Sequence, residues 1–328
     1  MSHFFDSGMF TRTPAWHRLG KVLPDWPGSW EEARLAAGLT WEVESRPIYQ
    51  YVAALSTPNS PLYAPIPGWH ELVRNDTFAT LSVQQESYAV IGNSEFGNMI
   101  EYLMGADLPG AKDLKYETLV SLKGGQIIAV TLYLDQPITL PHDPSVTVPY
   151  IVLRTRHDGS GGFGGGATGV RVVCANTLAA AEANMESNGS FFTIRHTSNW
   201  ASRTEEARMK MAAAIHSFAD WKDTATALAN QQVSTADTEQ FLDFWMPYST
   251  AMTVRQREST TRGRAKFRAY YDSATCEGIA GTKWGLLQAA VELCDHGTNS
   301  RSSETEVNRV LVTGDTRKAK ALVAVNRL

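Results

Sequence analysis

The sequence predicts an α+β protein built from three regions. We expect a mixed α+β region over residues 1–110, an antiparallel β-hairpin/β/α core over residues 111–199 and a helical region over residues 200–328. The first has short elements between proline- and glycine-rich turns, the second a dense β pattern, and the third apolar residues at helical spacing. The chain of 328 residues suffices for about two domains, and its 43% hydrophobic and 20% charged residues exclude a disordered chain.

A capping box predicts the first helix. Ser29 and Glu32 stand three positions apart, so each side chain can satisfy a backbone N–H that is left free at a helix start. The helix is expected over residues 30–37, and Gly38 is expected to end it in the left-handed conformation.

The rest of the first region is expected to alternate strands and loops. Strands are predicted at residues 41–43 and 48–55. Residues 57–68 contain four prolines and are predicted to be loop. Ser94 is expected to cap a helix that runs to Met104.

The central region begins with a predicted hairpin. Two β-prone runs flank Lys123, Gly124 and Gly125, and the two glycines can adopt the positive φ angles of a tight turn. A third strand is predicted at residues 150–156. Residues 157–169 hold seven glycines and are predicted to be irregular loop.

A helix and a further strand complete the central core. The helix is expected to begin near Asn176 or Thr177 and to end at Gly189, and the strand covers residues 191–197. The predicted order is therefore hairpin, strand, glycine-rich loop, helix, strand.

The last region carries an apolar seam with alternating spacings of three and four, typical of a packed helix. Its members are Ala207, Met211, Ala214, Phe218, Trp221, Ala225 and Leu228. Packing within the chain is the favoured interpretation, and an oligomer contact is the alternative. Further helices are expected at residues 238–245, after Thr250 and at residues 284–294.

Charge is distributed unevenly along the chain. The net charge is −4, but residues 1–150 hold nine basic and 16 acidic side chains, net −7, and the remainder is net +3. A polyanion partner would therefore bind in the second half. Three cysteines, no leader-like apolar segment and no long apolar run predict a cytoplasmic protein with reduced thiols.

Two basic clusters predict where a polyanion would bind. In the first, alternation puts Arg154 and Arg156 on one strand face, and other basic residues follow on neighbouring elements. The second cluster lies within residues 254–268. Guanidinium groups bind phosphates, and adjacent aromatic rings can stack on unpaired bases. The candidate nucleic-acid-binding residues are Arg154, Arg156, His157, Arg171, Arg195, His196, Arg255, Arg257, Arg262, Arg264, Lys266 and Arg268.

Catalytic alternatives have weaker support. Glycine-rich loops can bind phosphate, but the Lys-containing motif of nucleotide-binding loops is absent. His157, Asp158, Ser160, Cys174 and Asn176 contain the residue types of a nucleophilic triad, although their spacing does not place them together. No histidine or cysteine spacing predicts a metal site. We expect no enzymatic activity and no cofactor.

Five motifs stand out along the chain: PAWHRLG (14–20), RHDGS (156–160), TGVRVVCANTL (168–178), IRHT (194–197) and WGLLQAAVELCDH (284–296). Together they resemble one family, the phage/plasmid-like proteins of domain-of-unknown-function family nine-thirty-two. Arg18 stands where the family pattern has Gly, and Gly169 where it has Pro. The resemblance implies a phage, prophage or plasmid context. Residues 116–186 are also similar to the β-β-β-α core of Rad-type single-strand annealing proteins.

The annealing resemblance implies a function for the basic clusters. We expect the chain to bind single-stranded DNA and promote strand annealing in recombination, as a homo-oligomeric ring or filament, without nucleotide hydrolysis. One alternative is a phage structural or host-protein-binding protein without nucleic-acid activity. Another is a hydrolase or transferase that uses His157, Asp158 and Cys174.

Overall fold

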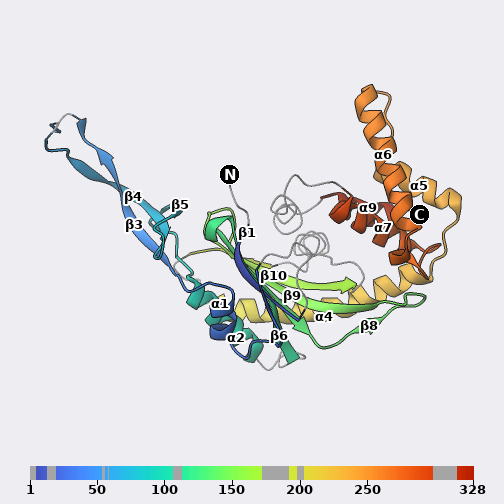
Figure 1. Cartoon of the computed structure of the whole chain (residues 1–328), viewed down its shortest axis with the longest axis horizontal. Coiled ribbons are helices and arrows are strands. Elements are labelled where there is room, and N and C mark those ends of the chain that lie inside the picture. Colours follow the sequence, from blue (N-terminus) through green and yellow to red (C-terminus); the bar gives the residue numbers. More distant parts are fainter. Residues whose placement is uncertain are drawn as a thin grey trace. The chain divides into compact units, whose positions relative to one another are not determined.

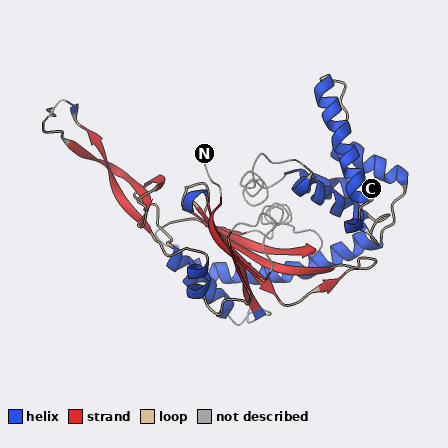
Figure 2. Cartoon of the chain, in the orientation of Figure 1, coloured by secondary structure: helices blue, strands red, loops and turns tan. Residues whose placement is uncertain are grey.

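The computed structural model describes most of the chain and divides it into two compact units (Figure 1). Unit 1 comprises Met1–Leu132, Leu153–Gly165 and Phe192–Met211, and unit 2 comprises Tyr133–Val152, Gly166–Phe191 and Ala212–Leu328. The described residues are 5–12, 20–53, 56–57, 59–105, 113–171, 192–197, 203–297 and 316–328. The predicted α+β class is confirmed: strands dominate the first part of the chain and helices the last (Figure 2). The three predicted regions stay a prediction.

Two sheets contain the described strands. The larger has the order β11-β10-β9-β7-β6-β1-β2, with β8 paired to β9, and the smaller has the order β3-β4-β5. The bounds of the larger sheet are β1 (Phe5–Thr11), β2 (Lys21–Leu23), β6 (Leu114–Leu122), β7 (Ile127–Leu134), β8 (Ile138–Thr139), β9 (Val146–Arg156), β10 (Phe163–Arg171) and β11 (Phe192–Ile194). Those of the smaller sheet are β3 (Val43–Tyr51), β4 (Tyr63–Arg74) and β5 (Thr80–Gln85).

The described helices confirm most of the predicted ones. The bounds are α1 (Trp30–Ala36), α2 (Asn93–Gly105), α4 (Thr204–Asn230), α5 (Thr235–Trp245), α6 (Val254–Tyr271), α7 (Lys283–His296) and α9 (Thr316–Asn326). The sequence pattern did not predict α9. The helix expected near Asn176 lies outside the described residues. Among the helices of the described segments, none has the length and apolar composition needed to cross a bilayer.

Local hydrogen bonds explain why α1 forms where the capping box predicts it. The Ser29 hydroxyl accepts a hydrogen bond from the Glu32 N–H at 3.2 Å. The Glu32 carboxylate reaches one residue further back than expected and accepts from the Gly28 N–H at 2.7 Å. Gly38 ends the helix at a φ of 75°, as predicted.

The helix α2 is confirmed, but its predicted cap is wrong. It begins at Asn93, so Ser94 lies inside its first turn. The Ser94 hydroxyl donates to the carboxylate of Glu42, a residue 52 positions away in the sequence. A contact over that distance leaves no local pattern from which to predict it.

The hairpin of β6 and β7 is also confirmed. Lys123, Gly124 and Gly125 form a short 3-10 turn, labelled η3, with φ angles of 54°, 67° and 102°. A Cβ on Gly125 would stand 2.6 Å from the Trp41 ring. This glycine therefore permits both the turn and the close packing of a buried tryptophan.

The loop predicted over residues 57–68 is wrong, because β4 begins at Tyr63 and runs through two prolines. Only the part of β4 from Trp69 onward pairs with β5, so residues 63–68 have β3 alone as a partner. The Val52 N–H donates to the Leu62 carbonyl at 2.9 Å, and the alternation of antiparallel pairs then turns the nitrogen of Pro65 away from β3. Proline is tolerated there because no donor is needed.

Two further strand predictions require correction. Residues 41–43 and 48–55 do not form separate strands: β3 runs continuously from Val43 to Tyr51. The expected glycine-rich loop is strand from Phe163 onward, where β10 pairs with β11. A Cβ on Gly162 would stand 2.0 Å from the Ile194 carbonyl oxygen, so glycine at this position allows a close backbone approach.

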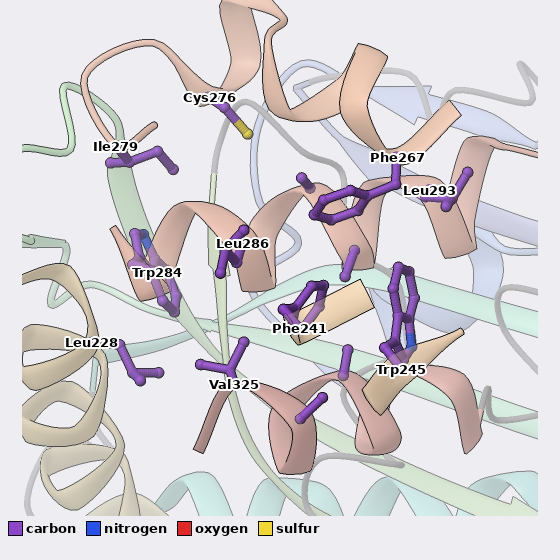
Figure 3. Packing of buried hydrophobic residues seen from close by; sticks show 14 of the residues in the cluster. Leu228, Phe241, Trp245, Phe267, Cys276, Ile279, Trp284, Leu286, Leu293 and Val325 are labelled. Atoms are coloured by element: carbon purple, nitrogen blue, oxygen red, sulfur yellow. The ribbon is translucent and has the colours of Figure 1, made fainter. Parts of the chain in front are cut away.

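The helices of unit 2 enclose a hydrophobic core that fits the intramolecular interpretation of the α4 seam. Ala225 and Leu228 are buried in it and Trp221 packs against it. Figure 3 shows Leu228 near Trp284. It also shows the Phe241 ring beside the rings of Trp245 and Phe267. Burying each such large side chain contributes roughly 1.5–3 kcal/mol. The middle of the seam, Ala214 and Phe218, lies outside the side chains that the structure describes.

Candidate nucleic-acid interface

The first basic cluster begins on β9 of unit 1. Arg154 and Arg156 are half-exposed, and they alternate with the buried residues Leu153 and Thr155. The two arginines therefore share the outer face of the strand, as the alternation predicts. The Arg156 guanidinium donates to the Ser160 hydroxyl at 3.3 Å, which leaves most of its five donors available for a ligand.

A second exposed arginine lies close to the same end of β9. A Cβ on Gly161 would stand 2.9 Å from the Arg156 Cδ, and a Cβ on Gly162 would stand 3.1 Å from the Arg195 Cα. Arg156 and the exposed Arg195 thus flank one glycine pair. Guanidinium groups are well suited to bind phosphates, so both arginines are candidates for contacts to an extended strand.

Tyr88 connects the two arginine-bearing segments. Its hydroxyl donates to the Arg156 carbonyl at 3.0 Å, and its ring stacks on His196 with centroids 4.9 Å apart and planes 14° apart. The following residue, Ala89, donates its N–H to the His196 carbonyl at 3.3 Å. A residue more than 60 positions away from either arginine therefore sets their spacing.

A shallow hollow of about 520 Å³ opens beside Tyr88 in unit 1. Its lining combines an aromatic ring at the rim with amide and hydroxyl groups. The Trp69 side chain is 41% exposed, which is unusual for so large an apolar group. The lining residues are Trp69, Gln84, Gln85, Ser87, Tyr88, His196 and Thr197. Such a surface can stack on a base, with arginines alongside for the phosphates.

The two candidate histidines do not share this role. His157 is fully buried, and burial lowers its pKa to about 3. Electrostatic interaction with His196 also lowers the pKa of His157. His196 is buried too, and burial lowers its pKa to about 4. Both rings are therefore neutral near pH 7. Neither ring presents a charged group at the surface, so we assign the two histidines a structural role and not a phosphate contact.

The nucleophilic-triad alternative finds no geometric support in the described part of the chain. Asp158 accepts hydrogen bonds from the Ser160 N–H at 2.9 Å and from its hydroxyl at 2.6 Å, which is ordinary turn geometry. Neither ring nitrogen of His157 has a hydrogen-bond partner there. Cys174 and Asn176 lie outside the described residues. No three His, Cys, Asp or Glu side chains in the described segments group as metal ligands.

The second basic cluster lies on α6 of unit 2, and three of its cations bind within the protein. Arg264 is buried and donates to the Leu242 and Met246 carbonyls and to the Asp243 carboxylate, so it satisfies the end of α5. Lys266 donates to the Gly297 carbonyl at 2.5 Å, just beyond α7. Arg268 pairs with Glu239 at 2.6 and 2.8 Å. These contacts account for much of the positive charge that the sequence concentrates on this helix.

The remaining cations of α6 are exposed. Arg255 and Arg257 lie in its first turns, and Arg262 makes a 3.8 Å ion pair with Glu258. An exposed pair of this length contributes little to stability. Arg171 belongs to β10, but its side chain lies outside what the structure describes.

The sequence pattern missed the aromatic part of the site. Trp69 and Tyr88 approach His196 only through the pairing of strands far apart in the chain, and Trp69 follows the prolines that predicted a loop. Their one local signal is a large aromatic residue among polar neighbours. That signal has no period and is common on protein surfaces.

Comparisons with known proteins give one match. A family model described as Domain of unknown function (DUF932) matches residues 80–313, which include Tyr88, the basic clusters and four of the five motifs quoted above. Trp69 lies outside the match. No curated protein matches the chain, and no solved structure does. The similarity to single-strand annealing proteins stays a hypothesis.

Proposed function

The chain belongs to the DUF932 family, whose description states no function, and we propose that it binds single-stranded DNA through unit 1 and promotes strand annealing. The observation that carries this proposal is the hollow beside Tyr88. It places an exposed Trp69 ring between polar side chains and lies next to the segments that hold Arg156 and Arg195.

The chemistry of this surface favours single strands over duplex. Stacking on Trp69 requires the face of an unpaired base, which a duplex does not offer, and each such contact contributes roughly 1–3 kcal/mol. Arg154, Arg156 and Arg195 supply phosphate contacts that are independent of sequence. Two acidic residues lie near this surface. The Asp158 carboxylate bonds to Ser160 within its own turn, and the exposed Glu86 stands between Gln85 and Ser87 of the hollow.

Annealing follows from how such a strand would be held. Contacts to phosphates and base faces leave the Watson–Crick edges open for a complementary strand, and no nucleotide hydrolysis is needed. Two strands must be brought together, so we propose that a homo-oligomer is the active form. We propose that this activity takes place in the cytoplasm of the host cell, within recombination of the mobile element, a context that the resemblance to phage and plasmid proteins supports.

A fluorescence-anisotropy titration with labelled single- and double-stranded oligonucleotides tests the proposal. We expect micromolar or tighter binding to single strands that weakens steeply as salt rises, because phosphate contacts release counterions. Salt-insensitive binding, or no binding at micromolar protein, would refute it.

Three variants then locate the site. Arg156→Ala and Arg195→Ala should each lower the magnitude of the salt slope by about 0.7, the value per phosphate contact on single strands. Trp69→Ala should weaken binding roughly tenfold with little change in slope, because it removes stacking and no charge. Arg257→Ala, an exposed arginine on α6, is the matched control and should leave both quantities near native.

A protein-binding role without nucleic-acid activity is the second candidate. The observation that favours it is an exposed part of the β3 and β4 ribbon, residues 47–69, which contains no Asp, Glu, Lys, Arg or His. Reversing the charge of Arg154 and Arg156 together should abolish annealing and spare this second role.

A further inference from the structure

The ribbon formed by β3 and β4 has an unusual surface composition. In Figure 1 the two strands continue beyond β5 as a two-stranded ribbon. Residues 47–69 contain no Asp, Glu, Lys, Arg or His. Tyr49, Tyr51 and Tyr63 are nevertheless 57%, 55% and 58% exposed. An isolated two-stranded ribbon is marginally stable in water, and exposed apolar strands are normally protected by charges.

The two long edges of this ribbon differ. The outer edge of β4 carries Pro65, whose nitrogen faces away from β3, so that edge lacks a donor at this position. The outer edge of β3 has no strand beside it in the described sheet. Its residues 48–52 read Ile-Tyr-Gln-Tyr-Val, without proline or charge. The usual devices against edge pairing are therefore present on β4 and absent from residues 48–52, at the end of β3.

The hydrogen-bond pattern shows which backbone groups the β3 edge presents. The Val52 N–H donates to the Leu62 carbonyl at 2.9 Å, and the Val52 carbonyl accepts from the Ser56 hydroxyl at 2.7 Å. By alternation, Gln50 points its N–H and C=O toward β4. Tyr49 and Tyr51 then point theirs outward. A free edge with two donors and two acceptors in this spacing can accept another strand.

We propose that β3 pairs antiparallel with β3 of a second copy of this chain, about a two-fold axis through Gln50. The five residues 48–52 form a near-palindrome, apolar–Tyr–Gln–Tyr–apolar. Antiparallel pairing about its centre places Tyr49 opposite Tyr51 of the second copy and Ile48 opposite Val52 of the second copy. A two-fold interface requires such self-complementarity, because the same patch contacts itself.

The backbone N–H and C=O groups that Tyr49 and Tyr51 point outward match this register. Tyr49 and Tyr51 of the second copy would form a hydrogen-bonded pair, and so would Tyr51 and Tyr49 of the second copy, with four backbone hydrogen bonds in all. Aromatic pairs directly across two strands add to the stability of a sheet. Two ribbons would then become one four-stranded sheet.

A second copy fits this edge better than other occupants. Nucleic acid would need cations, and residues 47–69 have none. A lipid surface could cover the tyrosine rings, but hydrocarbon cannot satisfy the outward N–H and C=O groups. An unrelated protein strand would satisfy those groups without any reason for the palindrome. The pairing uses neither the arginines nor the hollow, so it and the DNA binding proposed above can fail separately.

The first test measures the mass of the full chain by light scattering after gel filtration. We expect the native chain to show twice the monomer mass at tens of micromolar. Tyr49→Lys combined with Tyr51→Lys should weaken the dimer at least tenfold, because each lysine would face a lysine of the second copy. The matched control is Tyr63→Lys, which changes an equally exposed tyrosine one strand away from the edge and should stay dimeric.

The second test locates the two-fold axis by crosslinking. Gln50 would face Gln50 of the second copy in a pair without hydrogen bonds, with Cα atoms about 4.5 Å apart, a distance that a disulfide can span. Under mild oxidation, Gln50→Cys should therefore give a Cys–Cys dimer identified by peptide mapping. The control, Ser60→Cys, is exposed on the same ribbon but distant from the axis, and should give at least tenfold less dimer.

Each of the following results would overturn the proposal. They are a native chain that stays monomeric at 100 µM, a double lysine variant with native mass, and equal crosslinking of the two cysteine variants. Co-sedimentation of a monomeric native chain with phosphatidylcholine vesicles would overturn it in favour of a lipid surface.

Discussion

Two buried histidines make unit 1 sensitive to mild acid. Burial lowers the pKa of His157 to about 3 and that of His196 to about 4, from an ordinary value of 6.5. Both pKa values are depressed in the folded state, so the unfolded chain binds more protons over this range. The free energy of unfolding is therefore unaffected well above pH 6.5 and falls as pH drops from 6.5 toward 4 and 3.

The size of the effect follows from the two pKa values. Between pH 7 and pH 5 an unfolded histidine becomes mostly protonated while either folded ring stays mostly neutral. Each ring then lowers the free energy of unfolding by about 2 kcal/mol, since one pKa unit corresponds to 1.36 kcal/mol. The two together give about 3–4 kcal/mol, a large part of the stability of an ordinary domain.

Urea denaturation at pH 7 and pH 5, followed by tryptophan fluorescence and by hydrogen exchange of β9 amides, measures this loss. His157→Leu removes one titrating ring, and neither ring nitrogen has a hydrogen-bond partner in the described structure that the variant would strand. We expect this variant to lose about 2 kcal/mol less than the native chain between the two pH values. His70→Gln, which replaces a histidine on β4 outside the buried pair, is the control variant.

The reasoning fails if the native chain is equally stable at pH 7 and pH 5. It also fails if His157→Leu and His70→Gln change the pH dependence by the same amount, because the effect would then not come from burial of His157.

Three further predictions concern the arginines, the glycines and the neutral histidines. Arg264→Lys should destabilise unit 2 by roughly 2–3 kcal/mol in thermal unfolding, because the compact ammonium of lysine does not reproduce the planar fork with which the guanidinium reaches two carbonyls and a carboxylate; Arg262→Lys should change it by less than about 0.5 kcal/mol. Gly162→Ala should speed amide exchange in β10 and β11, because its Cβ would overlap the Ile194 carbonyl, whereas Gly105→Ala meets no atom within 4 Å and should not. Affinity for single-stranded DNA should stay constant within twofold between pH 8 and 6.5, and a rise of tenfold would mean that histidines contribute charge.

The correct fold predictions were those that rest on contacts between near neighbours in the sequence. Ser29 and Glu32 satisfy backbone groups within one helical turn, and Gly124 and Gly125 adopt turn angles that few other residues tolerate. The wrong ones concern strands with prolines or glycines and the cap of α2, where Ser94 bonds to the distant Glu42 instead. Pro65 is compatible with a strand only where one side of β4 lacks a partner, and Gly162 only where another strand approaches closely. Both conditions depend on distant residues.

The sequence predicted part of the candidate site and missed another part. Strand alternation correctly placed Arg154 and Arg156 on one outer face. Composition alone could not distinguish Arg257 from Arg264. Arg257 is exposed, whereas Arg264 is buried and donates to the Met246 carbonyl at the end of α5. The stacking surface of Trp69 and Tyr88 was missed, because its parts meet only through tertiary pairing.

By itself, the sequence determined the α+β class, the hairpin, the main helices, the family and the uneven distribution of charge, since these depend on composition, motifs and short-range hydrogen bonds. The tertiary structure decided which basic residues are exposed, that both candidate histidines are neutral, and that the uncharged residues 48–52 lie at a free strand edge. Those properties depend on which distant groups surround a residue. Burial changes the free energy of charging a side chain, and strand pairing determines whether its backbone N–H and C=O groups are already hydrogen-bonded.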